Sequence, residues 1–466
     1  MAITFVGWIL IPLGIAFYCC RKQYLYPLTI FLVPFSATAV MNVGTGDSDS
    51  GLPAALFVGC LWIATEIRSR SLSMTGESHL NKSRRRLQSF LVVVFISLLM
   101  PLWINGGLEI ESAMLLDTTA TPLRFSLKHV TQTLYLVYGI LLSLSIARKN
   151  VVVSEFMRTL RIFVCSAMFV SVWGFFQLGC SWLNIPYPAF LFNSSSTPSA
   201  QGYAELVDTL GTQRISSVTT EPSIFAVCML IALTFVLFAT VSRTPIISRI
   251  WDRLATGILI LGLILSTSTT AYLGLAFVLA LYCCALIYVR ILGLRHLLKL
   301  IVFFAILWGI YLVSPPVRDL VGAVLVNKAE TYSALETMKS YILAWSYFRA
   351  YPILGLGWGS VTSRDLVLKL LSNTGVLGCA AFLWFLLRSL LSLWHAARVN
   401  TVPNQARRWC AISICSAFLA VIVLNVITGF EYSYAQLWFV IGLAIAVPAM
   451  SAEALQAPPR VHLRTT

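Results

Sequence analysis

Long apolar stretches, separated by short polar segments, follow one another along almost the whole chain. A helix needs roughly 20 consecutive apolar residues to cross the hydrocarbon core of a bilayer. The pattern therefore predicts an all-α polytopic membrane protein with about 12–13 transmembrane helices. The candidate stretches lie at about 3–20, 24–42, 52–67, 87–104, 129–147, 162–183, 222–241, 254–267, 270–289, 300–314, 366–393, 409–428 and 433–450.

Composition supports the same class. Of the 466 residues, 58% are hydrophobic and 11% are charged, which excludes an ordinary soluble domain. The net charge of +15 does not indicate nucleic-acid binding. The basic residues lie in the short polar segments between apolar stretches, as is typical of the cytoplasmic loops of membrane proteins. The eleven cysteines lie almost all within apolar stretches and form no CxxC pair. We therefore expect no metal, no cofactor and no disulfide.

Charge in the polar segments predicts the orientation. Most of the 33 basic residues fall in one alternating set of segments, and the acidic residues favour the other set. By the positive-inside rule the basic set is cytoplasmic, so the C-terminus lies inside. An odd number of helices then puts the N-terminus outside. The first stretch has no basic leader and no small-residue cleavage site, which predicts a retained helix rather than a signal peptide.

Two long segments, 184–220 and 315–365, fall on the expected outer side. The second is unusual for that side because of its positive charge, which suggests that a phosphate-bearing substrate is held there. Its basic residues are Arg318, Lys328, Lys339, Arg349 and Arg364.

The same segment contains apolar residues at three- and four-residue spacing. This periodicity predicts an amphipathic helix lying at the membrane surface or folded back on it. The positions concerned are Leu335, Met338, Ile342, Trp345 and Phe348.

The chain divides into three predicted parts. Residues 1–210 hold N-terminal transmembrane helices and the first outer segment. Residues 211–393 form a catalytic core that includes the large outer loop 315–365, and residues 394–466 hold C-terminal helices and a cytoplasmic tail.

The first motif that could carry chemistry is RISSVTTEPS, Arg214 to Ser223. Pro222 occupies a position typical of the first residue of a helix, which makes Glu221 a capping acid. Alternatively, Glu221 accepts a proton from a substrate hydroxyl and Arg214 binds an anion. Both interpretations stay open from the sequence.

Two further motifs are rich in hydroxyl groups and in glycine. LSTSTTAYLGL, residues 265–275, predicts a tight turn between two helices, whose hydroxyls satisfy backbone groups or contact a ligand. FRAYPILGLGWGS, residues 348–360, allows close approach of the backbone to a ligand through Gly357 and its neighbours. It is neither a P-loop nor a dinucleotide fingerprint. Tyr351 and Trp358 are candidates for stacking on sugar rings or for an interfacial belt.

The fourth motif, SRDLVLKLLSNTGVLG, spans residues 363–378 and enters a helix at Asp365. That carboxylate is either a helix cap or a catalytic group. Arg214, Arg318, Arg349 and Arg364 are expected to converge above the bilayer, because guanidinium groups bind phosphate oxygens in a bidentate way. Lys328 and Lys369 are expected to act as membrane anchors.

The order of these four motifs resembles the O-antigen ligase and Wzy-type polymerase superfamily. The EPS and SNTG forms are most similar to exopolysaccharide repeat-unit polymerases. The resemblance covers roughly residues 210–390. It implies a GT-C-like fold in the bacterial inner membrane and a glycan donor carried on undecaprenyl pyrophosphate.

The resemblance also implies the reaction. The glycan passes with inversion, and without a metal, to a hydroxyl of an acceptor lipid-linked repeat unit in exopolysaccharide or capsule synthesis. Arginines hold the pyrophosphate, and a chain-length-regulating co-polymerase is an implied partner. We assign Arg214, Arg349 and Arg364 to pyrophosphate, with Lys339 and Arg318 as further candidates, and Gly357, Tyr351 and Trp358 to the glycan.

Two departures weaken a ligase interpretation. Ligases carry a His-Asn pair after the glycine-rich segment, where this chain has Ser363 to Asp365, and a Ser-Arg pair where this chain has Thr269 and Thr270. Only His129 among the histidines is expected near the outer face, so we assign the base to Glu221 or Asp365. The alternatives are an O-antigen ligase acting on lipid A core and a lipid-linked glycan flippase or other transporter.

Overall fold

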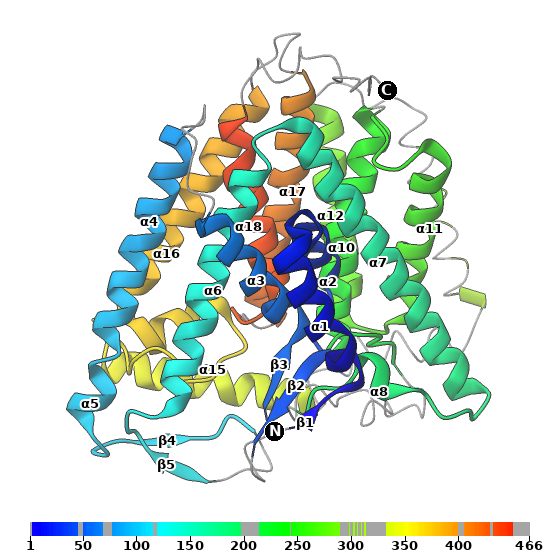
Figure 1. Cartoon of the computed structure of the whole chain (residues 1–466). Helices are drawn as coiled ribbons and strands as arrows, with labels where there is room; N and C mark the ends of the chain where they lie inside the picture. Colours follow the sequence, from blue (N-terminus) through cyan, green and yellow to red (C-terminus); the bar gives the residue numbers. More distant parts are fainter. Residues whose placement is uncertain are drawn as a thin grey trace.

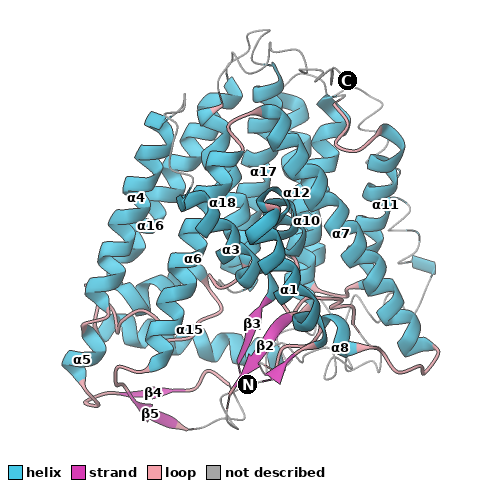
Figure 2. Ribbon diagram, viewed as in Figure 1, coloured by secondary structure: helices cyan, strands magenta, loops and turns pink. Residues whose placement is uncertain are grey.

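The computed structural model describes residues 2–44, 50–68, 77–114, 119–196, 214–242, 244–288, 332–398, 405–428 and 432–450, with isolated positions between 298 and 313. Within these residues the molecule is a bundle of long, roughly parallel helices, with short strands at one end (Figures 1 and 2). Seven helical segments of the described residues are long and apolar enough to cross a membrane. The chain is therefore a multi-pass helical membrane protein, as its apolar pattern predicts.

The membrane-spanning candidates coincide with predicted stretches. They are α4 (Glu77–Ser97) with α5 (Met100–Ile104), α6 (Leu127–Lys149), α7 (Val153–Trp182), α10 (Pro222–Ser242), α12 (Thr269–Tyr288), α16 (Leu366–Arg398) and α17 (Gln405–Thr428). Shorter helices occupy further predicted stretches: α1 (Phe5–Cys20), α3 (Ala54–Arg68), α11 (Arg249–Leu265) and α18 (Ala435–Ala449). The stretch 300–314 lies almost wholly outside the described residues, so the predicted total of 12–13 crossings stays a prediction.

The stretch 24–42 was wrongly predicted as one helix. After the 3-10 turn η1 (Lys22–Tyr24), helix α2 (Leu25–Leu32) ends, with Val33 as its C-cap residue. Pro34 follows, and because proline has no backbone N–H to continue the hydrogen bonds of the helix, the helix stops early although Val33 still has helical dihedral angles. The remainder of the stretch forms strand β2 (Ala39–Val43).

The prediction of a purely α fold is also wrong in detail, because the described residues contain two small antiparallel sheets. In the first sheet β2 lies between β1 (Ala2–Ile3) and β3 (Ser50–Pro53). The second pairs β4 (Glu109–Glu111) with β5 (Ala120–Pro122). The pairing satisfies the backbone hydrogen bonds of loops between helices.

The centre of the bundle is α18. All of its residues are buried, and it packs most extensively against α6. Gly139 of α6 allows this approach, since a Cβ atom there would meet the indole ring of Trp438. Helix α10 is similarly enclosed, by α7, α11, α12 and α17. These apolar helices form one continuous core on which both ends of the bundle are built.

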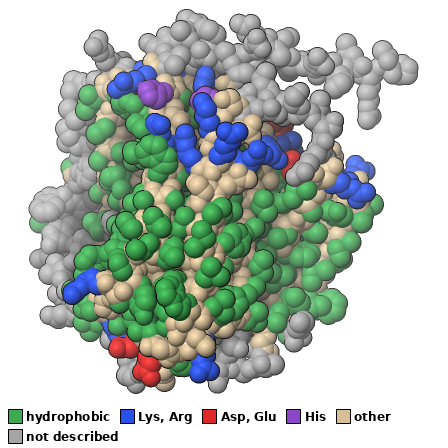
Figure 3. Space-filling view, turned by 90° about the vertical axis from the view of Figure 1, so that its left-hand side faces the viewer, with side chains coloured by type: hydrophobic (Ala, Val, Ile, Leu, Met, Phe, Trp, Pro, Cys, Tyr) green, Lys and Arg blue, Asp and Glu red, His purple; other side chains and the backbone are tan. Residues whose placement is uncertain are grey.

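Charge separates the two ends of the bundle. Figure 3 shows Lys, Arg and His side chains gathered at the upper end, above a broad apolar belt. Here α4 begins, α16 ends and α17 begins; we call this the basic end. The opposite end, which carries α15 (Tyr332–Ala350), the short helix α8 (Ala189–Phe192) and both sheets (Figure 1), is called the α15 end.

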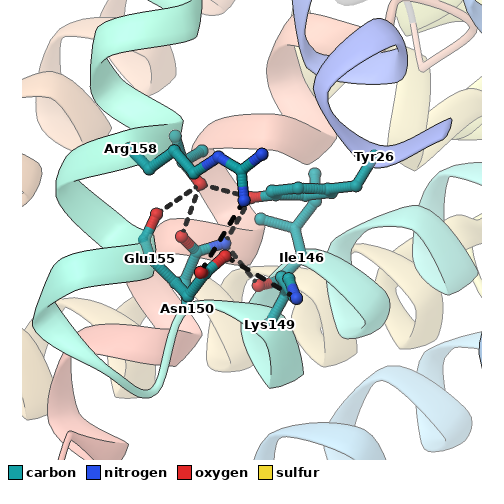
Figure 4. A network of polar contacts seen from close by, with 7 residues as sticks. Tyr26, Ile146, Lys149, Asn150, Glu155 and Arg158 are labelled. Carbon is teal, nitrogen blue, oxygen red and sulfur yellow. Dashed lines mark hydrogen bonds and ion pairs between the residues drawn. The ribbon is translucent and has the colours of Figure 1, made fainter. Parts of the chain in front are cut away.

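A buried polar network holds the basic end together where α2 meets α6 and α7 (Figure 4). The amide nitrogen of Asn150 donates to the Tyr26 hydroxyl and to the Ile146 carbonyl, both at 2.8 Å. Thr159 donates to the Asn150 oxygen at 2.7 Å. The side-chain polar groups of Tyr26, Asn150 and Thr159 all have partners within the network, so we interpret it as structural.

Helix α15 confirms the helix predicted within the second long segment. Its predicted apolar stripe faces away from the protein: Met338 and Ile342 are each 61% exposed. Its polar side faces inward, where Glu336 and Ser340 are buried. The Tyr347 hydroxyl also accepts a hydrogen bond from the backbone nitrogen of Glu111 in β4 at 2.9 Å.

Candidate functional site at the α15 end

The RISSVTTEPS segment runs through the protein interior before it enters α10. Gln177 of α7 holds it, because its side-chain oxygen accepts hydrogen bonds from the backbone nitrogens of Ser216 (3.1 Å) and Ser217 (2.8 Å). Asn193 donates to the Ser217 carbonyl at 2.9 Å. Residues 215–220 are all buried. The segment is therefore a rigid support for the two charged residues at its ends.

Arg214, at the start of this segment, contacts the predicted hydroxyl-rich turn. Its Nε donates to the Oγ1 of Thr267 at 3.2 Å, and its Nη2 donates to the Thr267 carbonyl at 2.9 Å. Thr267 has a φ of 46°, in the left-handed region. Two motifs separated by 53 residues therefore meet at one place.

Glu221, at the other end, lies where its sequence position predicts, directly before α10. Its carbonyl accepts the backbone hydrogen bonds of Ile224 and Phe225, both at 3.1 Å. The carboxylate itself is exposed and accepts a hydrogen bond from the Ser223 hydroxyl at 2.9 Å. The backbone of Glu221 caps the helix, and its side chain remains accessible for chemistry.

The glycine-rich segment is fastened to the start of α16 by Asn373, the asparagine of SNTG. Its side-chain oxygen accepts from the backbone nitrogens of Gly359 (3.1 Å) and Val361 (3.0 Å). Its amide nitrogen donates to the carbonyls of Val361 (2.9 Å) and Lys369 (2.7 Å). The third and fourth motifs therefore also form one unit.

Helix α16 is interrupted next to this unit. Gly375 has a φ of 63°, and an added Cβ would lie 2.1 Å from the Ile353 carbonyl oxygen. The carbonyls of Pro352 and Ile353 accept hydrogen bonds from the amides of Val376 (2.8 Å) and Leu377 (3.4 Å), which continue the helix. The break directs the first turns of α16 toward the glycine-rich segment.

The predicted glycan contacts on this segment have structural roles in the described geometry. Trp358 is 1% exposed, packs against Tyr432 with the ring centroids 4.5 Å apart and the rings tilted by 42°, and donates to the Gln132 carbonyl at 3.3 Å. No face of its ring is open to a sugar. Gly357, with φ 98°, packs against Pro101, and Tyr351 packs against a second small apolar cluster.

Arg364 and Asp365 stand where α15 meets α16. The Nη2 of Arg364 forms an ion pair with the Oε2 of Glu336 on α15 at 3.0 Å. Asp365 caps α16, because its Oδ1 accepts the backbone hydrogen bond of Leu368 at 2.6 Å. Burial raises the pKa of Asp365, although the backbone amides of Leu368 and Val367 oppose this shift. Burial together with the nearby Asp365 charge raises the pKa of Tyr341, so these two side chains lie close together.

A buried hydroxyl beside this cap points to a ligand. The Oγ of Ser363 is buried and has no hydrogen-bond partner among the described residues. A buried hydroxyl without a partner is costly, so such groups often mark a place where a ligand or water completes the hydrogen bonding.

The other predicted cations are dispersed. Arg349 is exposed on α15, with no hydrogen bond or ion pair to the described residues. Lys339 donates to the carbonyl of Met114 at 3.0 Å and so ties α15 to the loop after β4. Arg318 lies outside the described residues. No contact of the described residues joins Arg214, Arg349 and Arg364, so the convergence of four arginines stays a prediction.

Sequence reasoning placed Lys369 wrongly as a membrane anchor. It is only 4% exposed, and its Nζ lies 4.9 Å from the centre of the Tyr432 ring. It sits one helical turn after Asp365, which puts a buried cation inside the candidate site. A single basic residue in an apolar helix beginning at an outer loop is the signal that could have revealed it.

The turn between α17 and α18 was also missed, and it joins the two halves of the site. Tyr432 contacts Lys369 and donates to the side-chain oxygen of Gln132 at 2.5 Å. Two residues on, the Tyr434 hydroxyl lies 3.0 Å from that of Thr220 in the RISSVTTEPS segment. The paired tyrosines between two apolar helices were the available signal.

His129 is closer to the site than its sequence suggested. It is buried at the start of α6, and its Nε2 lies 3.0 Å from the Oγ of Ser360 in the glycine-rich segment. Its Nδ1 accepts a hydrogen bond from the backbone nitrogen of Ser126 at 3.1 Å. That bond makes Nε2 the protonated nitrogen of the neutral ring, which donates to Ser360.

No protein-family model matches the chain, and no curated protein matches it.

Proposed function

We propose that this protein is a bacterial inner-membrane glycan polymerase of the Wzy type. It transfers a glycan from undecaprenyl pyrophosphate to a hydroxyl of an acceptor lipid-linked repeat unit. The observation that supports this most directly is that all four motifs meet in pairs at one end of the bundle. Arg214 binds the turn at Thr267, and Asn373 binds the glycine-rich segment.

The charge distribution supports the side on which this happens. Under the positive-inside rule the basic end lies in the cytoplasm, so the α15 end faces outward. An outward site suits a donor presented on the outer leaflet. The exposed apolar stripe of α15 fits against that leaflet and would sit beside the lipid carrier.

Cations at the α15 end suit a pyrophosphate leaving group. Arg214, Arg364 and the buried Lys369 are candidates for its binding, and Arg349 offers a further exposed guanidinium. As the bond from the anomeric carbon to the pyrophosphate oxygen breaks, negative charge grows on that oxygen. Cations fixed beforehand stabilise this charge best where water is excluded, which favours the buried Lys369.

The base that completes the reaction is Glu221. The acceptor hydroxyl oxygen forms the new bond to the anomeric carbon, its proton passes to the carboxylate, and undecaprenyl pyrophosphate leaves. The Glu221 carboxylate is exposed, whereas an oxygen of Asp365 is occupied by the cap of α16. Asp365 remains the second candidate because its raised pKa suits proton exchange.

The test uses purified protein, lipid-linked repeat units from the native host, and a gel that resolves polymer length. Wild type is compared with Arg214→Ala and Glu221→Gln, and with Arg253→Ala as a control for an exposed arginine on α11. We expect a ladder from wild type and the control, and single units from both site variants. Movement of intact units across proteoliposomes, with no ladder, would contradict the proposal and favour a transporter.

An O-antigen ligase is the second candidate, because the contact of His129 with Ser360 brings a histidine to the glycine-rich segment. The same purified protein can be given a lipid A core acceptor. Transfer of one glycan to that acceptor, without repeat-unit ladders, would favour the ligase.

A further inference from the structure

The basic end contains a pocket that the proposed reaction does not use. It lies between α4, α16 and α18 and has a volume of about 230 Å³. Basic and hydroxyl side chains line much of it. They are His79, Lys82, Ser83, Arg86, Arg388, Ser389 and Ser392.

The charge of the lining residues favours binding of an anion. No carboxylate is among its lining residues. The cations Lys82, Arg86 and Arg388 instead face one cavity together with His79. Gathering like charges costs free energy unless a counter-charge binds between them.

Arg407 lies next to the pocket without lining it, because it contacts one of the lining residues. Its Nη2 donates to the carbonyl of Pro448, a lining residue, at 2.7 Å. Its Nε is buried and has no hydrogen-bond partner among the described residues. The guanidinium of Arg407 therefore places one more positive charge beside the pocket.

The surface beside the pocket indicates what carries the anion. The guanidinium of Arg388 lies 4.6 Å from the ring centre of Trp384, whose side chain is about half exposed. Farther along α4 and α16, Val92, Phe95 and Leu387 also expose apolar side chains. The pocket therefore lies at the basic end, where Figure 3 shows Lys, Arg and His side chains above the apolar belt, at a height where lipid headgroups are expected.

We propose that this pocket binds the phosphate headgroup of an anionic phospholipid in the leaflet at the basic end, with the acyl chains along α4 and α16. Basic pockets between transmembrane helices recognise such headgroups. General membrane anchoring does not explain the arrangement. Arg84 and Arg85 are exposed, whereas Arg86 on the same helix lines the pocket.

The test compares Arg86→Gln/Arg388→Gln with Arg85→Gln, which removes a neighbouring charge outside the pocket. Each full-length protein is purified in detergent and given phosphatidylglycerol or phosphatidylcholine in mixed micelles, and native mass spectrometry counts the retained lipids. Wild type and Arg85→Gln should retain phosphatidylglycerol. Its affinity should fall by about tenfold or more in the double variant, since each basic residue contributes about 1 kcal/mol.

Three outcomes would overturn the proposal. They are equal retention in all three proteins, equal retention of phosphatidylcholine, and displacement of the lipid by millimolar inorganic phosphate, which would indicate a site for a soluble anion. The thermal midpoint and the gel-filtration profile of the double variant confirm that it is folded, so that lost retention reports the pocket.

Discussion

The side-chain oxygen of Asn373 lies 3.1 Å from the backbone nitrogen of Gly359, fourteen residues earlier in the chain. This contact fixes the glycine-rich segment to the first turns of α16. Because those turns carry Lys369 and begin at Asp365, Asn373 controls the position of the charged groups without bearing charge itself.

Replacing Asn373 with leucine should therefore loosen the whole unit. Asn373→Leu leaves the buried amides of Gly359 and Val361 without an acceptor, at a cost of about 1–3 kcal/mol each. We expect a clear fall in the thermal midpoint and loss of glycan transfer. Asn425→Leu is the control, since that amide bonds to the carbonyl of Val421 in its own helix. Equal midpoints for the two variants would contradict the role of Asn373.

Gly357 should not tolerate a side chain. Its φ is 98°, and an added Cβ would lie 2.5 Å from the ring of Pro101. Backbone strain and overpacking together should cost Gly357→Ala about 3 kcal/mol. Gly257→Ala, in α11 with nothing within 4 Å, should be neutral or slightly stabilising. Denaturation of both variants in the same detergent measures the difference.

Asp365 should give the protein a specific pH dependence. Burial raises its pKa in the folded state, so the folded protein binds this proton more tightly than the unfolded chain does. The stability that it contributes is present below the unfolded pKa and is lost as pH rises through the raised pKa. Asp365→Asn keeps an oxygen for the cap but removes the titration.

The measurement is the thermal midpoint of both proteins from about pH 3 to about pH 7, where carboxyl groups titrate. The midpoint of wild type relative to Asp365→Asn should fall as pH increases across the acidic range. A difference that is constant with pH, or that rises, would show that Asp365 is not perturbed in this direction.

Lys369 should contribute to activity rather than to stability. Lys369→Met keeps an unbranched side chain of similar length, and the loss of the contact with Tyr432 is offset because no charge is then buried, so the midpoint should change little. Polymer formation should fall at least about a hundredfold if Lys369 stabilises the leaving group. Full activity of Lys369→Met would show that Lys369 does not stabilise the leaving group.

The outward stripe of α15 should contact lipid. Met338 and Ile342 are largely exposed, whereas Glu336 and Ser340 on the other side of the helix are buried. In nanodiscs containing a diazirine-labelled phospholipid, mass spectrometry should find label on Met338 and Ile342 but not on the buried pair. Trp384, exposed on α16, serves as the positive control. Label on Trp384 alone would place α15 away from the bilayer.

The sequence predicted most helices and the local chemistry at their ends. Glu221 with Pro222 lies at the start of α10, Asp365 caps α16, and α15 forms with its apolar stripe outward. These features depend on neighbours a few residues away. Caps and helical periodicity express local rules, so one sequence is sufficient to find them.

The sequence did not predict how the helices are turned about their own axes. Helices such as α10 and α18 are apolar on every side, so no polar face indicates which residues point inward. The contacts of Lys369 with Tyr432 and of His129 with Ser360 depend on that rotation. The strands were missed because their pairing joins segments that show no alternation of their own.

The break at Gly375 divides α16 into a short N-terminal part, which we call the arm, and a long C-terminal part, which we call the shaft. The arm, with Lys369 and Asn373, is clamped to the glycine-rich segment, while the shaft runs through the apolar belt. A shaft tilts to match the thickness of the surrounding bilayer. We expect a tilt of the shaft to bend α16 at this break, where the carbonyls of Pro352 and Ile353 accept the hydrogen bonds of Val376 and Leu377. The arm, with Lys369 and Asn373, is then expected to keep its position on the glycine-rich segment in membranes of different thickness.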